Sequence, residues 1–412
     1  MDTFNTLGDL NYKGRRVLLR VDINCPMDKK TLKIINDVRI RAVVPTIREL
    51  MGKEAKLVIL AHQSRKGKWD FTDLSQHAAL LSRNLNAPVK YVDDVIGDEA
   101  KKAIQELKDG EVLLLGNVRA IDSESESKPM EEHAKGEIVS NLAPLFDFYV
   151  CDAFGAAHRS QASLVGFEAV LPSAAGRLMS KEIYALRTIF NEPRRPSVFI
   201  LGGAKFDDVP YMIDRVLGNG TADQVIIVGL AGNAFLAARG RDIGEASRAP
   251  LKEDLTEENF RNAQEIMEKY SEKIILPVDV AVEGPNGERV SVNIGDMAKA
   301  GAAIDIGNKS IERFVKVIRG SRTSFMSGPA GMFEKPGFDV GTRSLMEAMV
   351  ESKGLTVLGG GHTSAAAEKF DLADSMSYLS TGGGALETFL LQEPLPVVVA
   401  LEHSKQKFGT GQ

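Results

Sequence analysis

The sequence predicts an α/β fold with two Rossmann-like domains, each built on a parallel sheet, separated by a hinge helix and a cleft. Short apolar runs rich in β-formers alternate with helical stretches along the whole chain, which is typical of parallel-sheet proteins. The 412 residues are enough for two domains of ordinary size. In the middle of the chain, Leu178–Phe190 has apolar residues at helical spacing. Asn191, Pro193 and Pro196 end that helix, because proline lacks the amide and disfavours helical geometry before it.

In the first half of the chain, short apolar runs predict strands and periodic stretches predict helices. The expected strands are Arg16–Val21, Lys56–Ala61, Val89–Tyr91, Glu111–Leu115 and Asp147–Cys151. The expected helices are Val38–Met51, Leu74–Asn84, Asp98–Leu107 and Glu131–Asn141. The acidic stretch Asp122–Glu126 is most simply an exposed loop.

The strands expected in the second half often run into glycine. These strands are Ser197–Leu201, Gln224–Val228, Ile274–Pro277, Thr323–Met326, Leu355–Leu358 and Met376–Leu379. The glycines that follow them are Gly202, Gly229, Gly328, Gly359 and Gly382. Ligands bind open α/β sheets at the carboxyl ends of the strands, so these turns are expected to form one rim. Leu395–Gln412 fits either half on its own pattern.

Composition excludes several classes of partner. The net charge of −5 gives no general attraction to nucleic acid or to acidic membranes, so neither is expected as a partner. No apolar run approaches the length of a membrane span, and the N-terminus lacks the features of a signal peptide. Cys25 and Cys151 are too few for a disulfide framework. A reducing cytoplasm is therefore the expected location.

Basic groups follow strands at four places in the first half. They are Arg20 with Arg39, His62 with Arg65, Arg119 after Asn117, and His158 with Arg159. Any one such arginine is most simply a surface ion pair. Four strand ends that each deliver one are expected to share a pocket at one edge of the sheet. Arginine grips phosphate and carboxylate oxygens with its planar fork, so the predicted ligand is a small polyanion such as a phosphorylated acid.

Glycine runs in the second half indicate a second anion site. Gly202–Lys205, Gly328–Gly331, Gly359–Gly361 and Gly382–Gly384 let backbone amides approach a phosphate, and a following helix adds its N-terminal dipole. Ala365–Phe370 and Ala385–Leu391 are expected to be such helices. Any single run is most simply a tight turn. No Walker A lysine loop and no GxGxxG fingerprint after a strand is present, which leaves a nucleotide site of another kind.

Nine motifs occur in order over nearly the whole chain. They are RVDIN (Arg20–Asn24), VRIR (Val38–Arg41), NVR (Asn117–Arg119), DAFGAAHR (Asp152–Arg159), LGGAK (Leu201–Lys205), LPVD (Leu276–Asp279), SGPAGMFE (Ser327–Glu334), GGGHT (Gly359–Thr363) and STGGG (Ser380–Gly384). Together they closely resemble phosphoglycerate kinase. The short loops and the GGGHT variant look most like archaeal members.

This resemblance implies reversible transfer of a phosphoryl group between 1,3-bisphosphoglycerate and MgADP, giving 3-phosphoglycerate and MgATP, in glycolysis and gluconeogenesis. It implies a glycerate-binding domain over residues 1–172, an interdomain hinge over 173–192 and a nucleotide-binding domain over 193–392. The final segment, 393–412, is expected to return to the N-terminal domain. The protein is expected to be a monomer or a homodimer.

The matching motifs also imply individual site residues. The glycerate would be bound by Asp22, Ile23, Asn24, Arg39, His62, Gln63, Ser64, Arg65, Arg119 and Arg159. The nucleotide would be bound by Lys205, Glu334, Gly360, Gly361, His362 and Thr363. The residues expected around the transferring phosphoryl group are Arg39, Lys205, Gly361 and Gly384. Phosphoryl transfer depends on positioning and charge stabilisation more than on a protein nucleophile, so this set suits the chemistry.

The sequence departs from the family at two positions near the phosphates. Bacterial and eukaryotic members usually carry Asp at the position of His362 and Lys at that of Val209, so one charge of each sign is lost here. Neutral imidazole is a poor Mg²⁺ ligand. The sequence therefore predicts no protein metal ligand at this place, with Mg²⁺ held by nucleotide phosphates and water. In this hypothesis His362 donates a hydrogen bond; the alternative is that His362 caps the helix that starts near Thr363.

Two other functions remain open on sequence. A different α/β kinase acting on a phosphorylated acid would keep the basic pocket but not the block-by-block match. A two-lobed binding protein without chemistry would keep the hinge but would not need Lys205 or the glycine rim.

Overall fold

The computed structural model describes residues 3–203, 206, 208–253 and 255–410. The chain divides into two compact units. Unit 1 comprises Met1–Tyr184 and Glu393–Gln412, and unit 2 comprises Ala185–Gln392. Helix α7, Arg177–Asn191, runs across the boundary between them along the sequence.

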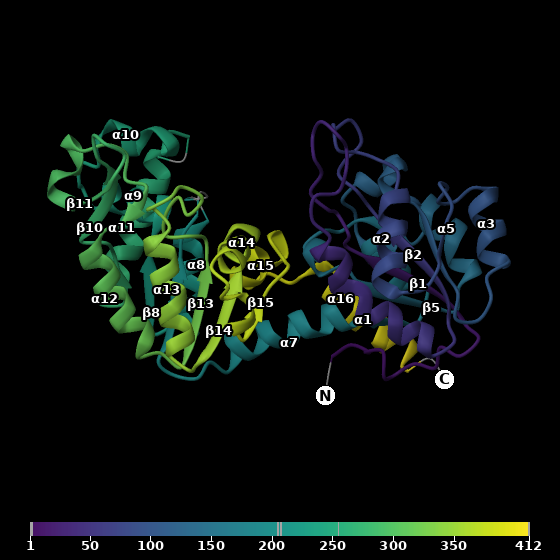
Figure 1. Cartoon of the computed structure of the whole chain (residues 1–412). Coiled ribbons are helices and arrows are strands. Elements are labelled where there is room, and N and C mark those ends of the chain that lie inside the picture. The colour runs from purple at the N-terminus through teal and green to yellow at the C-terminus, as the bar shows by residue number, and fades with distance from the viewer. Residues whose placement is uncertain (1–2, 204–205, 207, 254, 411–412) are drawn as a thin grey trace. The chain divides into compact units, whose positions relative to one another are not determined.

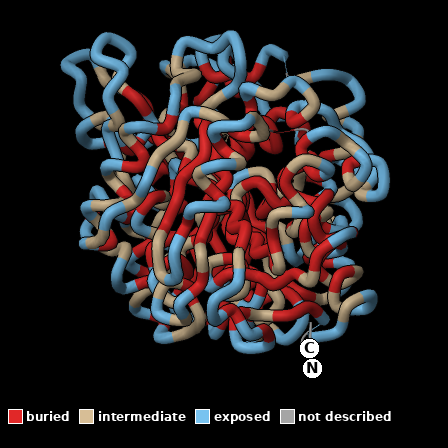
Figure 2. The backbone as a smooth tube through the Cα atoms, turned by 90° about the vertical axis from the view of Figure 1, so that its right-hand side faces the viewer, coloured by how far each residue is buried: buried red, intermediate tan, exposed pale blue. Residues whose placement is uncertain are grey.

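Unit 1 contains a six-stranded parallel sheet with the strand order β3-β4-β2-β1-β5-β6. The strands are β1 (Arg16–Val21), β2 (Lys56–Ala61), β3 (Val89–Tyr91), β4 (Val112–Asn117), β5 (Phe148–Asp152) and β6 (Ser173–Ala175). The four central strands are almost wholly buried, which explains why they read as continuous apolar runs. Figure 2 shows these interior segments in red, with the connecting loops pale blue at the surface.

The helices of unit 1 cover this sheet (Figure 1). They are α1 (Val38–Gly52), α2 (Ser75–Leu85), α3 (Asp98–Gln105), α4 (Met130–His133), α5 (Glu137–Leu142), α6 (Ala162–Val165), the first part of α7, and α16 (Pro396–Phe408). The helix expected over Glu131–Asn141 is wrong as a single element, because the chain turns at Gly136 and forms α4 and α5. A Cβ at Gly136 would lie 3.2 Å from the carbonyl oxygen of His133, so this turn is tight.

The acidic stretch is exposed at Asp122, Ser125 and Glu126, as predicted, but it is not a plain loop and one of its glutamates is buried. Asp122–Ser125 forms a 3₁₀ turn, η2, and the side chain of Glu124 is completely buried. Its carboxylate accepts hydrogen bonds from the hydroxyl and the amide of Ser163, at 2.6 and 2.9 Å. A buried carboxylate needs such partners, and these come from a segment distant in sequence.

Unit 2 contains a second six-stranded parallel sheet, with the order β15-β14-β13-β7-β8-β9. Its strands are β7 (Ser197–Leu201), β8 (Gln224–Ile227), β9 (Ile274–Ile275), β13 (Thr323–Ser327), β14 (Leu355–Gly359) and β15 (Tyr378–Leu379). Each strand expected from the sequence is present, although β9 and β15 are shorter than expected. A three-stranded antiparallel sheet, which the sequence analysis did not predict, is formed by β10 (Asp279–Glu283), β11 (Arg289–Asn293) and β12 (Asp305–Ile306).

The helices of unit 2 pack around its parallel sheet, and α12 and α13 lie side by side (Figure 1). Besides the second part of α7, they are α8 (Val209–Gly218), α9 (Gly229–Ala238), α10 (Gly244–Arg248), α11 (Glu257–Lys269), α12 (Asn308–Arg319), α13 (Val340–Glu351), α14 (Gly361–Lys369) and α15 (Gly384–Leu390). The core beneath α12 and α13 is aliphatic and methionine-rich.

The final helix belongs to unit 1. In α16, the hydroxyl of Ser404 accepts the backbone amide of Ser173 at 2.9 Å, and the ammonium of Lys407 donates to the carbonyl of Ala169 at 2.8 Å. Near the other end of the chain, the amide of Asn5 donates to the carbonyl of Gly409 at 2.7 Å. Unit 1 is therefore assembled from the two ends of the chain. Among the described residues, none of the helices combines the length and apolar character that a membrane span requires.

Candidate functional site

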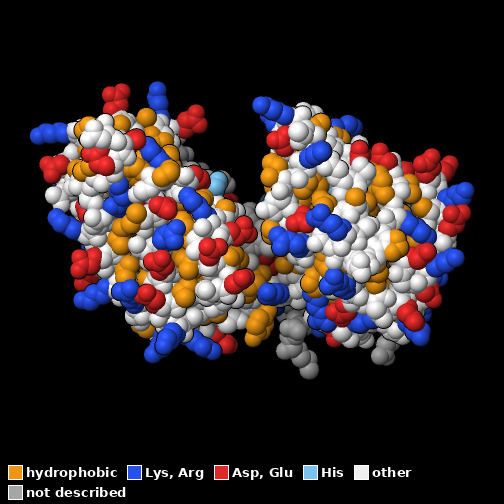
Figure 3. Space-filling model, in the orientation of Figure 1, with side chains coloured by type: hydrophobic (Ala, Val, Ile, Leu, Met, Phe, Trp, Pro, Cys, Tyr) orange, Lys and Arg blue, Asp and Glu red, His pale blue; other side chains and the backbone are white. Residues whose placement is uncertain are grey.

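The strand order of unit 1 brings the basic groups of the first half together. Strands β4, β2, β1 and β5 are neighbours in the sheet, so the residues that follow their carboxyl ends lie along one edge. Elsewhere on the molecule, the face in Figure 3 shows Lys and Arg side chains interspersed with Asp and Glu. The arginines at this sheet edge are therefore a local feature and not part of a generally basic surface.

Arg39 and Asp22 form an ion pair at this edge. The Nη1 atom of Arg39, in the first turn of α1, lies 2.5 Å from Oδ2 of Asp22, which directly follows β1. Asp22 is nearly buried, whereas the side chain of Arg39 is 37% exposed. A Cβ at Gly155 would lie 2.5 Å from Asp22 Oδ2, so the DAFGAAHR segment approaches this pair closely and needs glycine there.

The loops that carry Asp22 and Ser64 are tied together. The backbone amide of Ser64 donates to Oδ1 of Asn24 at 2.9 Å. The amide group of Gln63 is buried and bonds both the amide and the carbonyl of Cys25, each at 3.0 Å. The side chains of Asn24 and Gln63 thus fix the loops.

Arg119 is the most informative residue of the cluster. Its side chain is buried, and its Nη1 donates to the carbonyl of Ser64 at 2.6 Å. Its Nη2 is buried and has no hydrogen-bond partner among the residues that the structure describes. Burial, followed by the nearby positive charges of Arg20 and Arg159, lowers the pKa of Arg119 to about 10. A buried cationic donor without a partner is costly, and an anion would relieve both the missing bond and the repulsion.

Two further arginines complete the cluster. The pKa of Arg159 is also lowered, by burial first and then by the charge of Arg65. Arg65 is exposed and has no ion-pair partner within the described ranges. Within the described ranges neither arginine has a carboxylate within 4 Å, although the charge of Asp22 partly offsets the repulsion at Arg159, which distinguishes both from the surface ion pairs elsewhere in the chain.

Arg20 does not belong to the anion-facing set, contrary to the sequence analysis. Its guanidinium is completely buried, its Nε donates to Ser163 Oγ at 2.7 Å, and its Nη2 lies 3.0 Å from Nδ1 of His62. Glu124 lies 3.9 Å from the same Nη2. The charge of Arg20 is thus balanced inside the protein, by the residue that the sequence analysis had taken for exposed.

Unit 2 contains a cavity of about 310 Å³ next to its glycine turns. The lining residues share a mainly apolar character, with few polar groups: Gly203, Gly229, Leu230, Asn233, Ser247, Pro250, Pro277, Val280, Ala302, Ala303, Ile304, Asp305, Ile306, Pro329, Ala330, Gly331, Met332 and His362. A concave apolar site with a few polar groups suits a flat, largely apolar ring system. One end of the cavity is made by the glycine turns, where a phosphate is expected.

The glycine turns are packed backbone against backbone. Gly328 has φ +89°, and a Cβ there would lie 2.2 Å from the carbonyl carbon of Gly202. A Cβ at Gly229 would lie 2.7 Å from the carbonyl oxygen of Pro329. The ends of β7, β8 and β13 can therefore meet only because these positions lack side chains.

Helix α14 begins beside these turns. Its first residue is Gly361, and the preceding cap residue is Gly360, with φ +87°. The hydroxyl of Thr363 is buried and accepts the backbone amide of Gly328 at 2.8 Å, which ties α14 to the SGPAGMFE loop. His362 lies in the first turn, exposed, and lines the cavity. The alternative that His362 caps this helix is wrong, because Gly360 occupies the cap position.

Of the remaining residues expected at the nucleotide site, some lie where the sequence predicted and others do not. Gly384 begins α15, as the glycine-helix pattern predicted. Glu334 is exposed and does not line the cavity. Lys205 lies outside the described residues. The sequence analysis missed Asn233 and Asp305, which line the cavity and come from α9 and the unpredicted β12. Burial raises the pKa of Asp305 to about 6.

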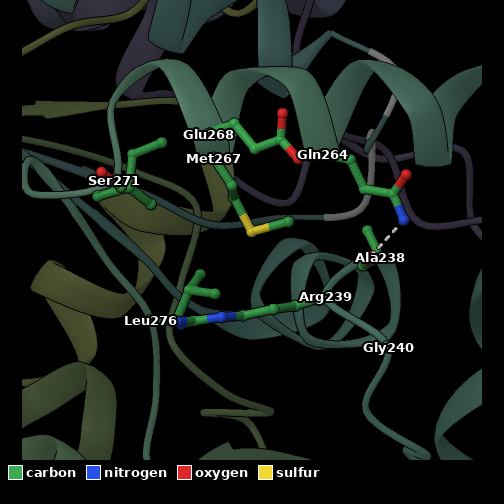
Figure 4. Close-up of a pocket in the computed structure, with 9 residues that line it drawn as sticks. Ala238, Arg239, Gly240, Gln264, Met267, Glu268, Ser271 and Leu276 are labelled. Carbon is green, nitrogen blue, oxygen red and sulfur yellow. Dashed lines mark hydrogen bonds between the residues drawn. The ribbon is translucent and has the colours of Figure 1, made fainter.

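A second pocket, of about 550 Å³, lies on unit 2 between the end of α9, α11 and β9. Figure 4 shows Gln264 and Met267 of α11 facing Arg239 and Leu276, with the Gln264 amide hydrogen-bonded to the carbonyl of Ala238 at 2.8 Å. None of its described lining residues has a buried polar atom without a partner. It therefore lacks the unpaired donor that distinguishes the Arg119 cluster.

Taken together, unit 1 has a cluster of arginines with an unpaired buried donor, and unit 2 has an apolar cavity that ends in glycine turns. These features define an α/β protein with two candidate ligand sites, one in each unit. Comparisons with known proteins agree with this class. The family model for phosphoglycerate kinase matches residues 7–393.

Relatives match over almost their full length. Phosphoglycerate kinase from Methanothermus fervidus is 42% identical over 407 residues, with 99% of each chain covered. That from Methanothermobacter thermautotrophicus is 44% identical, covering 98% of this chain and 97% of the relative. The crystal structure of phosphoglycerate kinase from Pyrococcus horikoshii aligns with a TM-score of 0.91 at 38% identity, over 98% of this chain and 100% of that one. The chain belongs to the phosphoglycerate kinase family.

This membership confirms the resemblance inferred from the nine motifs, including its similarity to archaeal members. It also confirms the predicted fold class at the level of two parallel-sheet α/β units. The protein is an enzyme of the kinase class, a phosphotransferase with a carboxyl group as acceptor (EC 2.7.2.3). A different α/β kinase and a two-lobed binding protein are thereby excluded.

Proposed function

We propose that unit 1 binds 3-phosphoglycerate or 1,3-bisphosphoglycerate at the arginine cluster, and that unit 2 binds MgADP or MgATP at the cavity. The phosphoryl group passes between the carboxylate of the glycerate and the terminal phosphate of the nucleotide. The observation that carries the acceptor site is the buried Nη2 of Arg119, which has no hydrogen-bond partner in the described part of the chain. A phosphorylated acid supplies the oxygen that this atom lacks.

Within unit 1, the proposed role of each arginine depends on whether its side chain already has an ion-pair partner. Arg65 and Arg159 have no ion-pair partner among the described residues and are proposed to grip the distal phosphate. Arg39 is partly exposed, lies beside Asp22 and is proposed to face the transferring group. Because the charge on that group grows in the transition state, Arg39 is expected to affect kcat more than binding.

Within unit 2, the apolar lining is proposed to hold the adenine ring, and the amides at the start of α14 are proposed to hold phosphates. Helix α14 has nine residues, and a helix N-terminus favours an anion. Gly384, at the start of α15, is proposed to provide a second such group. Lys205 and Glu334 keep their proposed roles at the transferring group and the ribose. The proposed reaction requires the ligands of the two units to meet, and α7 is proposed as the hinge.

Mg²⁺ is proposed to enter with the nucleotide. Across the described ranges, no three His, Cys, Asp or Glu side chains stand together as a metal-binding group. The residues therefore fit an ion held mainly by phosphate oxygens and water, with α14 holding the phosphates. When bound, Mg²⁺ neutralises charge on the phosphates.

The role of His362 can be tested by titrating Mg²⁺ at fixed ADP in the parent and in His362→Ala. Its side chain is exposed at the first turn of α14, so its removal leaves the core intact. Hydrogen-bond donation predicts a lower kcat with a nearly unchanged Mg²⁺ midpoint. A large shift of the midpoint would identify His362 as a metal ligand instead.

The experiment that tests the whole proposal is a coupled assay of ATP-dependent phosphorylation of 3-phosphoglycerate. Parent protein should turn over, and Arg119→Gln should lose most of its activity through a raised KM for 3-phosphoglycerate. Arg48→Gln is the matched control and should retain full activity, because the guanidinium of Arg48 donates to the carbonyl of Asn84 on the surface of unit 1. Activity of Arg119→Gln equal to that of this control would refute the acceptor site.

A cytoplasmic location is proposed from the cysteines. Cys25 and Cys151 are both free and buried. Free thiols in place of disulfides fit a reducing compartment.

A further inference from the structure

Behind the arginine cluster, unit 1 contains a buried polar chain that links Glu124 to His62 through Arg20. All three side chains are almost inaccessible to solvent. They come from η2, β1 and the loop after β2, so the fold and not the local sequence assembles them. Buried polar groups of this kind are retained only when their bonds are satisfied.

Arg20 is held from both sides. Its Nε donates to Ser163 Oγ at 2.7 Å, and its Nη1 donates to the carbonyl of Val21. The Ser163 hydroxyl donates in turn to Glu124 Oε1 at 2.6 Å. The hydroxyl of Tyr149 donates to the carbonyl of Ser163 at 2.7 Å, which fixes that segment. Glu124 therefore orients Arg20 through Ser163 and balances its charge from 3.9 Å.

The remaining nitrogen of Arg20 determines the state of His62. Nη2 of Arg20 lies 3.0 Å from Nδ1 of His62. A guanidinium can only donate hydrogen bonds, so Nδ1 has to accept. A neutral imidazole whose Nδ1 accepts carries its proton on Nε2. Within the described part of the chain, no group is hydrogen-bonded to that Nε2.

The surroundings oppose the charged form of His62. Burial contributes most, followed by the positive charges of Arg20, Arg119, Arg159 and Arg39; the carboxylates of Glu124 and Asp22 pair with Arg20 and Arg39. Together they lower the pKa of His62 well below its ordinary value. The ring is thus a neutral donor among cations, which lets it donate to an anion without adding to the repulsion between the arginines.

We infer that Glu124 and Arg20 are positioning residues that hold His62 as the neutral Nε2–H tautomer, so that its Nε2 donates to the bound glycerate. The part that concerns the glycerate rests on the proposed function of the arginine cluster. The part that concerns the tautomer does not, since it follows from the contacts within unit 1. The two parts can therefore fail separately.

The tautomer is measured first, on the unmodified protein without substrate. Long-range ¹⁵N–¹H correlation spectra distinguish a protonated Nε2 from a protonated Nδ1, and the spectrum of His62→Gln identifies the signals of His62. We expect protonated Nε2 and unprotonated Nδ1 throughout pH 6 to 8. A proton on Nδ1, or an imidazolium at pH 7, would overturn the inference whatever the activity of the protein.

The link to Glu124 is then tested with Glu124→Gln, which keeps the shape but removes the charge. Glu126→Gln is the matched control, because Glu126 is a neighbouring glutamate of the same stretch but is exposed and paired only with Lys128. In Glu124→Gln we expect a mixture of His62 tautomers. We also expect a KM for 3-phosphoglycerate raised by about 5- to 10-fold, the scale of one lost hydrogen bond, with kcat within about twofold.

Four outcomes separate the possibilities. A single Nε2–H tautomer in Glu124→Gln would overturn the role of Glu124. A mixed tautomer with unchanged KM would show that His62 does not contact the glycerate, and would refute that part alone. If Glu124→Gln does not fold, Ser163→Ala breaks the same chain at the hydroxyl that joins Glu124 to Arg20 and should give the same mixture. If the parent protein lacks kinase activity, the tautomer result still stands.

Discussion

Replacing Arg119 with glutamine tests whether the buried, charged guanidinium of Arg119 destabilises unit 1 when no anion is bound. A bound anion should remove this cost. The pKa of Arg119 is lowered to about 10, against an ordinary arginine value above 12. At about 1.36 kcal/mol for each pKa unit, ionisation costs about 3 kcal/mol more here than in water. Solvent near the cluster reduces this to about 1–2 kcal/mol.

The loss of bonds works in the opposite direction. Arg119→Gln removes the hydrogen bond from Nη1 to the carbonyl of Ser64, which contributes about 1 kcal/mol. The two terms nearly cancel, so the free energy of unfolding of the variant should lie within about 1 kcal/mol of the parent value. A fully paired buried charge would behave differently, because removing one partner of such a pair costs about 3–5 kcal/mol.

The assay is thermal and urea unfolding with and without inorganic phosphate or 3-phosphoglycerate. The parent should be stabilised by either anion, since a ligand that binds only the folded state raises its stability. Arg119→Gln should lose most of this gain. Arg83→Gln is the control, because Arg83 is exposed and pairs with Asp37 at 3.4 Å; it should keep the full gain. A large loss of stability in ligand-free Arg119→Gln, or an unchanged anion effect, would refute the reasoning.

Three further changes test individual residues of the two units. Arg39→Ala should lower kcat by about 100-fold or more, the scale of one lost preorganised donor, and steady-state kinetics with kcat within a few-fold of the parent would remove its proposed catalytic role. Gly328→Ala should destabilise unit 2 by several kcal/mol, because its Cβ would lie 2.2 Å from Gly202; urea unfolding within about 0.5 kcal/mol of the parent would contradict this packing. Asp152→Asn should stabilise the protein at pH 7 by up to about 3 kcal/mol, but not at pH 3. Burial raises the pKa of Asp152 from 3.8 to about 6, so the folded state binds more protons in this range and stability falls as pH rises through it. Urea unfolding of parent and variant at several pH values, with an equal difference at pH 3 and pH 7, would argue against this linkage.

The parallel strands were predictable because their burial is recorded in the sequence as continuous apolar runs. Strand β1, for example, has its expected bounds. The antiparallel sheet was not predictable in this way. Strand β11 is largely exposed, so its residues carry no apolar run, and β12 has only two residues. Short or exposed strands depend on their partners for stability, and the sequence analysis could not see those partners.

The buried polar residues were the hardest part of the structure to predict from the sequence. An acidic run ordinarily indicates a solvated loop, and Glu124 is buried only because Arg20 and Ser163 come together from distant segments. For the same reason, Arg20 was read as a ligand-facing group. The anion-facing role of Arg119, expected from its place after a strand end, stays a prediction. The nucleotide role of Glu334 also stays a prediction, and only the motif resemblance suggested it.

The return of α16 to unit 1 affects how the protein is made on the ribosome. Unit 1 is interrupted by Ala185–Gln392, so the segment that packs on Ala169 and Ser173 is translated only after all of unit 2. At the usual rates of elongation, translation of Ala185–Gln392 takes about 10–40 s, and unit 1 lacks its last helix throughout. At the end of that time unit 2 is complete and can fold, whereas the last helix of unit 1 is still to be made. In nascent chains stalled before residue 393, unit 2 should therefore resist protease, whereas unit 1 should still be cleaved.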